Sequence, residues 1–189
     1  DATGVALGSA TTADNCGVAS VTNDAPAVFP LGTTTVTWTV TDNAGLTATD
    51  TQIVTVTDNE SPTITAPADV AVNTDASSCD ATGVALGSAT TSDNCGVASV
   101  TNDAPAVFPH GTTTVTWTVT DNAGLTATDT QVVTVTDNEA PTITAPADVA
   151  VNTDASSCDA TEVALGSATT ADNCGVASVT NDAPAVFPL

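Results

Sequence analysis

Alternating apolar and polar residues are the strongest signal along this chain. In residues 33–41, threonines alternate with two valines and Trp38, so the apolar side chains share one face of an extended strand. The segment ends at the turn sequence Asp-Asn-Ala-Gly of residues 42–45, and a second strand-like segment follows at 46–57. The pattern predicts an antiparallel hairpin with one buried face.

Shorter apolar segments, separated by proline and glycine, indicate further strands. No helical period is present, and about seven short strands in so small a unit are typical of a β-sandwich. We therefore expect an all-β protein of tandem immunoglobulin-like Greek-key β-sandwiches, with Trp38 and Trp117 at the centre of each core and Phe29 and Phe108 beside them. The shorter predicted strands are residues 63–65, 70–73, 84–86, 97–102 and 106–108.

The whole pattern recurs every 79 residues. The first copy covers residues 1–79, the second 80–158 and the third begins at 159. The first two copies are nearly identical, which predicts a tandem array of small domains and a segment of a longer mature protein. The expected domains are an incomplete repeat at 1–57, a complete repeat at 58–136 and an incomplete repeat at 137–189.

Composition restricts the class of protein. The chain has 22 acidic residues, no lysine and no arginine, and a formal net charge of -22. Its hydrophobic content of 41% is too high for an acidic disordered tail. Binding to nucleic acid requires cationic side chains to displace counterions, so we expect no nucleic-acid partner. No apolar segment reaches the length of about 18 residues that a membrane span needs, so we expect none.

The five cysteines indicate an oxidising compartment, and the expected location is extracellular or on a cell surface. Cys79 and Cys95 lie sixteen residues apart, and a bond between them would remove about 3 kcal/mol of unfolded-state freedom. We expect that bond and its counterpart between Cys158 and Cys174, which places the partner of Cys16 before the first residue. Zinc is a weak alternative, because two cysteines per repeat without a neighbouring histidine cannot close a zinc site.

Four motifs stand in residues 80–158: DNCG at 93–96, FPHGTTTVTW at 108–117, TDNAG at 120–124 and VTDNEAP at 135–141. Together these motifs resemble the hyalin repeat (HYR) family of extracellular immunoglobulin-like modules. The resemblance covers the whole repeat and implies a β-sandwich used in adhesion and in extracellular fibres. Members of that family often carry another cysteine in the penultimate strand, where this chain has Asp50 and Asp129, which leaves one disulfide within each repeat.

The acidic turns suggest calcium at the joints between repeats. Residues 137–141 are similar to the calcium-binding linkers of cadherins, and 121–124 to a turn in bacterial immunoglobulin-like adhesins that holds calcium at domain junctions. Calcium takes six to eight oxygen ligands, which carboxylates and amides supply. The alternative is that the Asp-Asn pairs form turns without an ion. The candidate ligands are Asp42, Asp58, Asn59 and Glu60 at one joint, and Asp121, Asp137, Asn138 and Glu139 at the next.

Catalysis is not expected. The only histidine, His110, is replaced by Leu31 and Leu189 at the equivalent positions, so the repeats share no Ser-His or Cys-His mechanism. The expected function is structural: a segment of an extracellular filament or adhesin shaft whose partners are further copies of itself along and beside the filament. The alternative is a carbohydrate- or protein-binding adhesion module that uses end loops such as 102–109.

Overall fold

A computed structural model describes residues 1–189, and the chain is all-β. The strands form one four-stranded sheet, one three-stranded sheet and several two-stranded sheets, in agreement with the alternating sequence pattern. No helix is present that could cross a membrane. Contacts divide the chain into two compact units: Asp1–Pro62 with Ser92–Ser99 and Thr120–Ala127, and Thr63–Thr91 with Val100–Val119 and Thr128–Leu189.

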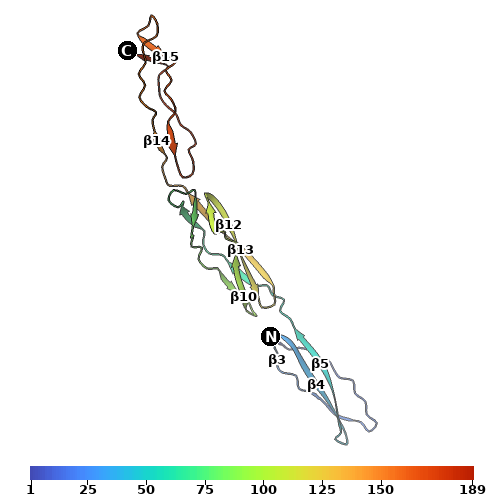
Figure 1. The fold of residues 1–189 in the computed structure, drawn as a ribbon. Coiled ribbons are helices and arrows are strands. Elements are labelled where there is room, and N and C mark those ends of the chain that lie inside the picture. Colours follow the sequence, from blue (N-terminus) through green and yellow to red (C-terminus); the bar gives the residue numbers. More distant parts are fainter. The chain divides into compact units, whose positions relative to one another are not determined.

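The first copy forms a three-stranded sheet in the order β2-β4-β5 and a small pair, β1-β3. The predicted hairpin is confirmed, because β4 and β5 pair antiparallel from Gly32 opposite Val56 to Thr41 opposite Thr47. The two strands lie side by side in Figure 1. The strands are β1 (Ala2–Thr3), β2 (Val18–Asn23), β3 (Val28–Phe29), β4 (Gly32–Asp42) and β5 (Thr47–Val56).

Residues 63–136 hold a more complete set of eight strands. Their four-stranded sheet has the order β10-β12-β13-β7, and two pairs, β8-β11 and β6-β9, accompany it. Strand β7 joins the sheet parallel to β13, with Val70 opposite Val133. The strands are β6 (Thr63–Thr65), β7 (Val70–Asn73), β8 (Asp80–Thr82), β9 (Thr90–Ser92), β10 (Val97–Asn102), β11 (Val107–Pro109), β12 (Gly111–Asp121) and β13 (Thr126–Thr136).

Residues 137–189 contain only the small strand pairs. Strands β14 and β16 pair as β6 and β9 do, and β15 and β17 pair as β8 and β11 do. Their bounds are β14 (Thr142–Thr144), β15 (Asp159–Thr161), β16 (Thr169–Ala171) and β17 (Val186–Pro188).

One predicted strand is wrong. Residues 84–86 have no strand conformation, and the pairing strands of this region are β8 and β9 on either side of them. Val84 and Leu86 still pack against the core, so their apolar character reflects burial of an irregular segment. The predicted strands at 63–65, 70–73 and 97–102 are confirmed.

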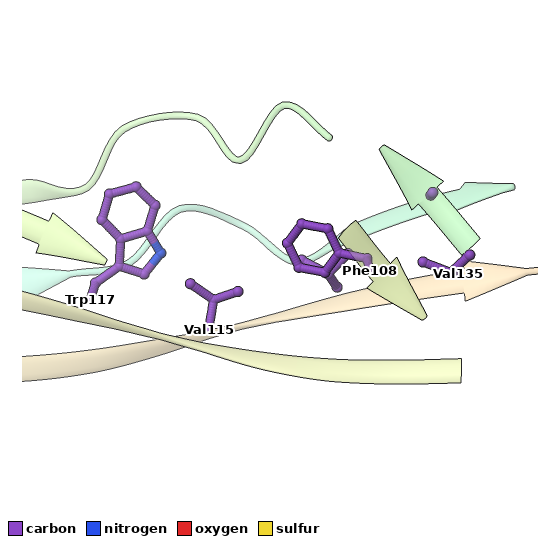
Figure 2. Close-up of a cluster of buried hydrophobic side chains, with 6 residues drawn as sticks. Phe108, Val115, Trp117 and Val135 are labelled. Carbon is purple, nitrogen blue, oxygen red and sulfur yellow. The ribbon is translucent and has the colours of Figure 1, made fainter. Parts of the chain in front are cut away.

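The core of the middle repeat lies against the inward face of β12. Trp117 is 6% exposed, and Phe108, Val115 and Val135 are buried around it (Figure 2). Trp38, the equivalent of Trp117, is only half-buried and lines a cavity of about 360 Å³. Ile64, Ala66, Val70 and Val72 pack against the middle core, whereas the space beside Trp38 is lined by Leu7, Val21 and Val40.

Gln131 is the largest fully buried side chain of this core. Its Oε1 accepts a hydrogen bond from Trp117 Nε1 at 3.2 Å, and its Nε2 donates to the carbonyl oxygens of Ala68 at 2.7 Å and Leu86 at 3.0 Å. This one amide therefore ties the hairpin to both irregular segments that cover it. The alternating pattern alone did not indicate a polar residue at this position.

Candidate metal centre and the joints between repeats

Asp121 is a carboxylate on the buried face of a strand. It ends β12, and alternation along that strand places it on the same face as Val115, Trp117 and Val119. Its side chain is 2% exposed. Burying a charged group is energetically costly unless the charge is paired, so the Asp121 carboxylate requires a partner.

Two further aspartates lie beside Asp121. Asp58 follows β5 in the segment that leads to β6, and Asp93 follows β9. Each of the three residues offers one carboxylate oxygen, and these oxygens all lie within 4.8 Å of one another. The group therefore joins the segment between the first and middle repeats to two loops of the middle repeat.

Each carboxylate of this acidic triad uses one oxygen locally and leaves the other without a donor. Asp93 Oδ2 accepts the N–H of Cys95, Asp58 Oδ1 that of Glu60, and Asp121 Oδ1 those of Ala123 and Leu125. Asp58 Oδ2, Asp93 Oδ1 and Asp121 Oδ2 are buried and accept no hydrogen bond. Buried oxygens of this kind are rare without a bound water or ion.

Electrostatics strengthen the case for a cation. Two carboxylates at this separation repel by roughly 3 kcal/mol near a protein surface. The chain contains no lysine or arginine, so no side-chain ammonium or guanidinium can offset that repulsion. A site made only of oxygen ligands suits a hard divalent cation, and calcium tolerates irregular geometry better than magnesium.

Asn122 holds the two loops of the triad together. Its Nδ2 donates to the carbonyl oxygen of Cys95 at 3.0 Å, and its backbone N–H donates to that of Gly96 at 3.1 Å. Gly96 has φ +98°, and a Cβ there would lie 2.9 Å from Asn122 Nδ2. A glycine is therefore required where the two loops meet.

The thiol of Cys95 is close to the acidic triad. Partial burial raises its pKa, and the nearby charge of Asp58 raises it further. Cys95 is unpaired, as are Cys16 and Cys158.

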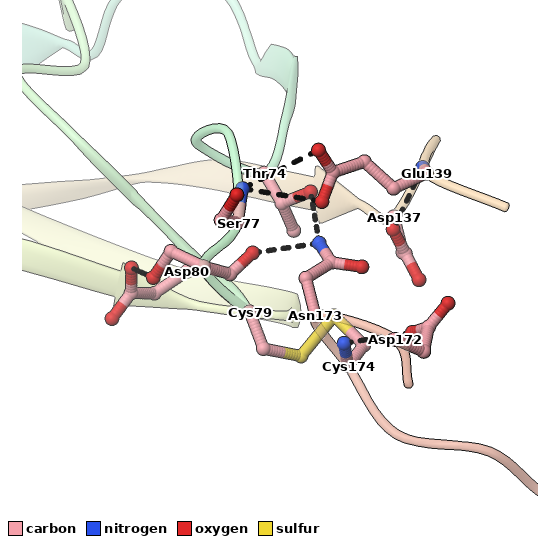
Figure 3. The surroundings of a disulfide bond; sticks show 10 residues. Thr74, Ser77, Cys79, Asp80, Asp137, Glu139, Asp172, Asn173 and Cys174 are labelled. Carbon is pink, nitrogen blue, oxygen red and sulfur yellow. Dashed lines mark hydrogen bonds between the residues drawn. A yellow bond between two sulfur atoms is a disulfide. The ribbon is translucent and has the colours of Figure 1, made fainter. Parts of the chain in front are cut away.

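The predicted disulfide pairing within each repeat is wrong. Cys79 is bonded to Cys174, 95 residues later, with their Cα atoms 4.7 Å apart (Figure 3). Cys95 and Cys158, the expected partners, carry free thiols. The bond thus links the end of the first copy to the third copy, because the turn that carries Cys79 meets the loop that carries Cys174.

Polar contacts surround this bond. Asn173 Nδ2 donates to the carbonyl oxygen of Ser78 at 2.7 Å and to Thr74 Oγ1 at 3.2 Å, and the carboxylate of Glu139 accepts the N–H of Ser77 at 3.1 Å (Figure 3). Cys174 N–H donates to Asp172 as Cys95 N–H donates to Asp93. The loop before each of these cysteines therefore has the same local conformation.

The structure brings together only part of the predicted ligand set. Asp58 and Asp121 meet, although the sequence placed them at different joints. Asp42 accepts the N–H groups of Ala44 and Leu46, and Asn59 and Asn138 are exposed.

At the next joint, Asp137 accepts the N–H of Glu139, whose own carboxylate caps the turn at Ser77. Asp137 and Asp172 are the equivalents of Asp58 and Asp93 there. Glu60 is exposed, and its backbone N–H donates to Asp58.

Asp93 is the ligand candidate that sequence reasoning missed. Its signal was present in the repeated Asp-Asn-Cys-Gly motif, in which the aspartate caps a turn with one oxygen and keeps the other free. The burial of Asp121 could also have been predicted from the sequence, because Asp121 continues the series of inward-facing positions Val115, Trp117 and Val119. No protein-family model matches the chain, and no curated protein sequence matches it.

Proposed function

We propose that this chain is a segment of an extracellular structural filament or adhesin shaft, built from tandem immunoglobulin-like β-sandwiches of the HYR type, with joints stiffened by calcium. The observation that carries the proposal is the acidic triad of Asp58, Asp93 and Asp121, with its three unpaired buried oxygens. An ion there would tie the segment between two repeats to the loops of the second one, and so restrict bending at the joint.

Other observations agree with this function. The four-stranded sheet, the two strand pairs and the core between them suit an immunoglobulin-like sandwich. A shaft needs repetition, whereas recognition modules commonly diversify their loops, and here the first two copies are almost identical. The disulfide and the acidic composition suit an extracellular setting.

Calcium binding is tested on the whole chain by titration calorimetry and thermal unfolding. A cation that binds only the folded protein stabilises it by about 2.7 kcal/mol at a hundredfold excess over its dissociation constant. We expect calcium to raise the melting temperature, EGTA to reverse the rise, and magnesium at the same ionic strength to do less.

Asp93→Asn supplies the decisive variant, because it removes one charge of the triad and preserves the shape of the side chain. Its matched control is Asp14→Asn, the equivalent position in the first copy, where Asp14 likewise accepts the N–H of Cys16. Loss of the calcium response in Asp93→Asn alone supports the site. An unchanged melting temperature and an unchanged small-angle scattering curve on adding EGTA would refute calcium stiffening.

A further inference from the structure

The disulfide spans more of the sequence than one period of the repeat. Cys79 and Cys174 are separated by 95 residues, whereas the sequence repeats every 79. Cys174 is the equivalent of Cys95 and of Cys16, and Cys158 is the equivalent of Cys79. Pairing across copies therefore offers the same bond to every repeat of a longer array.

We propose that these bonds connect the array as a series of overlapping covalent loops, so that every peptide bond of its interior lies inside at least one loop. This rests on the proposed function, in which the repeats continue with the same period. Each loop then covers 95 residues and the next begins 79 residues later, so neighbouring loops share the sixteen residues between Cys158 and Cys174 or their equivalents. A single cut in the main chain cannot sever such a filament.

The free thiols of this chain are explained by the same periodicity. In an array that continues with this period, Cys95 and its equivalent Cys16 would each bond to an equivalent of Cys79 from an earlier copy, and Cys158 would bond to an equivalent of Cys174 from a later copy. The loop before Cys95 already has the conformation seen before Cys174, because Asp93 and Asp172 accept the N–H groups of the two cysteines at 2.7 and 2.8 Å.

Bond formation requires an external oxidant. By thiol–disulfide exchange, two cysteine thiols and one molecule of oxidised glutathione give one protein disulfide and two molecules of reduced glutathione. Two electrons pass from the protein sulfurs to the glutathione disulfide, and the two thiol protons are released to the new glutathione thiols. An extracellular disulfide donor of this class is sufficient.

The overlapping disulfide loops also limit how far the array can be extended when its repeats unfold. The shortest covalent path through one repeat crosses a disulfide and then only the sixteen residues from Cys174 back to Cys158. At roughly 3.4 Å per extended residue, this path measures about 60 Å per repeat, against about 270 Å for the unbridged main chain. Unfolding of the repeats would therefore release little length while the bonds are intact.

Trypsin tests the loop in this chain directly. The sequence has no lysine or arginine, so one introduced lysine is the only cleavage site. Ser88→Lys, Ala106→Lys and Ser167→Lys place that site at exposed positions inside the loop from Cys79 to Cys174. Ala27→Lys and Ala185→Lys place it outside, at the positions equivalent to Ala106, and serve as matched controls.

After cleavage in EGTA, which removes any contribution of calcium, and transfer to urea, which separates strands that are only hydrogen-bonded, we expect the three inside variants to remain one species until a reductant is added. The two outside variants should separate at once. Separation of Ala106→Lys without reductant would indicate pairing within a repeat and overturn the proposal. Separation of Ser88→Lys would show that the loop begins at Cys95, and separation of Ser167→Lys would show that it ends at Cys158; either result also overturns the proposal.

A longer array, made by inserting further in-frame copies of residues 80–158, tests whether successive disulfide loops overlap. Oxidised with glutathione disulfide and stretched as a single molecule, it should reach roughly one quarter of the contour length that it reaches after reduction. Equal contour lengths would show that the loops do not overlap. This outcome is independent of calcium binding, since both measurements are made in EGTA.

Discussion

Asn122 donates a side-chain hydrogen bond to the carbonyl oxygen of Cys95 at 3.0 Å, and Asn43 makes the equivalent bond to Cys16 at 2.9 Å. The same contact therefore joins the same two loops in both copies. Only the Asn122 contact lies at the acidic triad, because Asp58 meets Asp93 and Asp121 there. Comparing substitutions of the two asparagines therefore separates the effect of this hydrogen bond on the two loops from its effect on a metal site.

Asn122→Ala should weaken calcium binding. The substitution removes one hydrogen bond between the loops of Asp93 and Asp121, worth about 1 kcal/mol, which corresponds to a roughly fivefold to tenfold loss of affinity. Titration calorimetry measures the change. Asn43→Ala is the control and should leave the affinity unaltered; an equal loss in both variants would contradict the role assigned to Asn122.

Gln131→Leu should destabilise the middle repeat. The substitution leaves Trp117 Nε1 and the carbonyl oxygens of Ala68 and Leu86 without partners, at about 1–3 kcal/mol for each group that stays buried. Urea unfolding followed by Trp117 fluorescence, in a Trp38→Phe background, measures the loss. Gln52→Leu, followed by Trp38 fluorescence in a Trp117→Phe background, should cost less, because Trp38 is only half-buried and water can replace the lost bond. Equal losses would argue against burial as the cause.

Asp129 should contribute a pH-dependent part of the stability. The N–H groups of Ala66 and Thr130 hold the pKa of its carboxyl below the usual value, and partial burial opposes them only weakly. A lowered folded-state pKa stabilises the fold fully above the unfolded value of about 4, and this stabilisation is lost as the pH falls through the folded pKa.

The stability difference between the native chain and Asp129→Asn should therefore be greatest above about pH 4 and should narrow at lower pH. Thermal unfolding across this range measures it. Asp50→Asn is the matched control, since Asp50 accepts the N–H of Thr51 but has no counterpart of the Ala66 contact. A difference that widens as the pH falls would contradict the assignment.

Calcium should promote side-by-side association of the chains. The net charge of -22 opposes contact, and 0.1 M salt screens that repulsion only beyond about 10 Å. Divalent ions can also bridge carboxylates, so light scattering should rise more with calcium than with monovalent salt of equal ionic strength. Chains that remain monomeric under every condition would remove lateral association from the proposed function.

Local pattern predicted much of the fold. The hairpin of β4 and β5 followed from alternating threonine and valine, and β6, β7 and β10 followed from short apolar segments between prolines and glycines. These signals depend on neighbours in sequence. The false strand at 84–86 has the same apolar content, but its residues fill space beside the core without backbone pairing, which no local pattern distinguishes.

The sequence by itself determined an all-β repeat that is acidic throughout, because alternation, period and charge are properties of neighbouring residues and of composition. Only the tertiary structure decided which loops meet. Cys95 and Cys174 are equivalent positions of one repeat, so spacing cannot tell which of them Cys79 binds, and the choice depends on how the turn at Cys79 meets the third copy. The grouping of Asp93 with Asp58 and Asp121 was undetermined for the same reason. Contacts across a joint depend on the tertiary structure, because a periodic sequence offers the same residues at several equivalent positions.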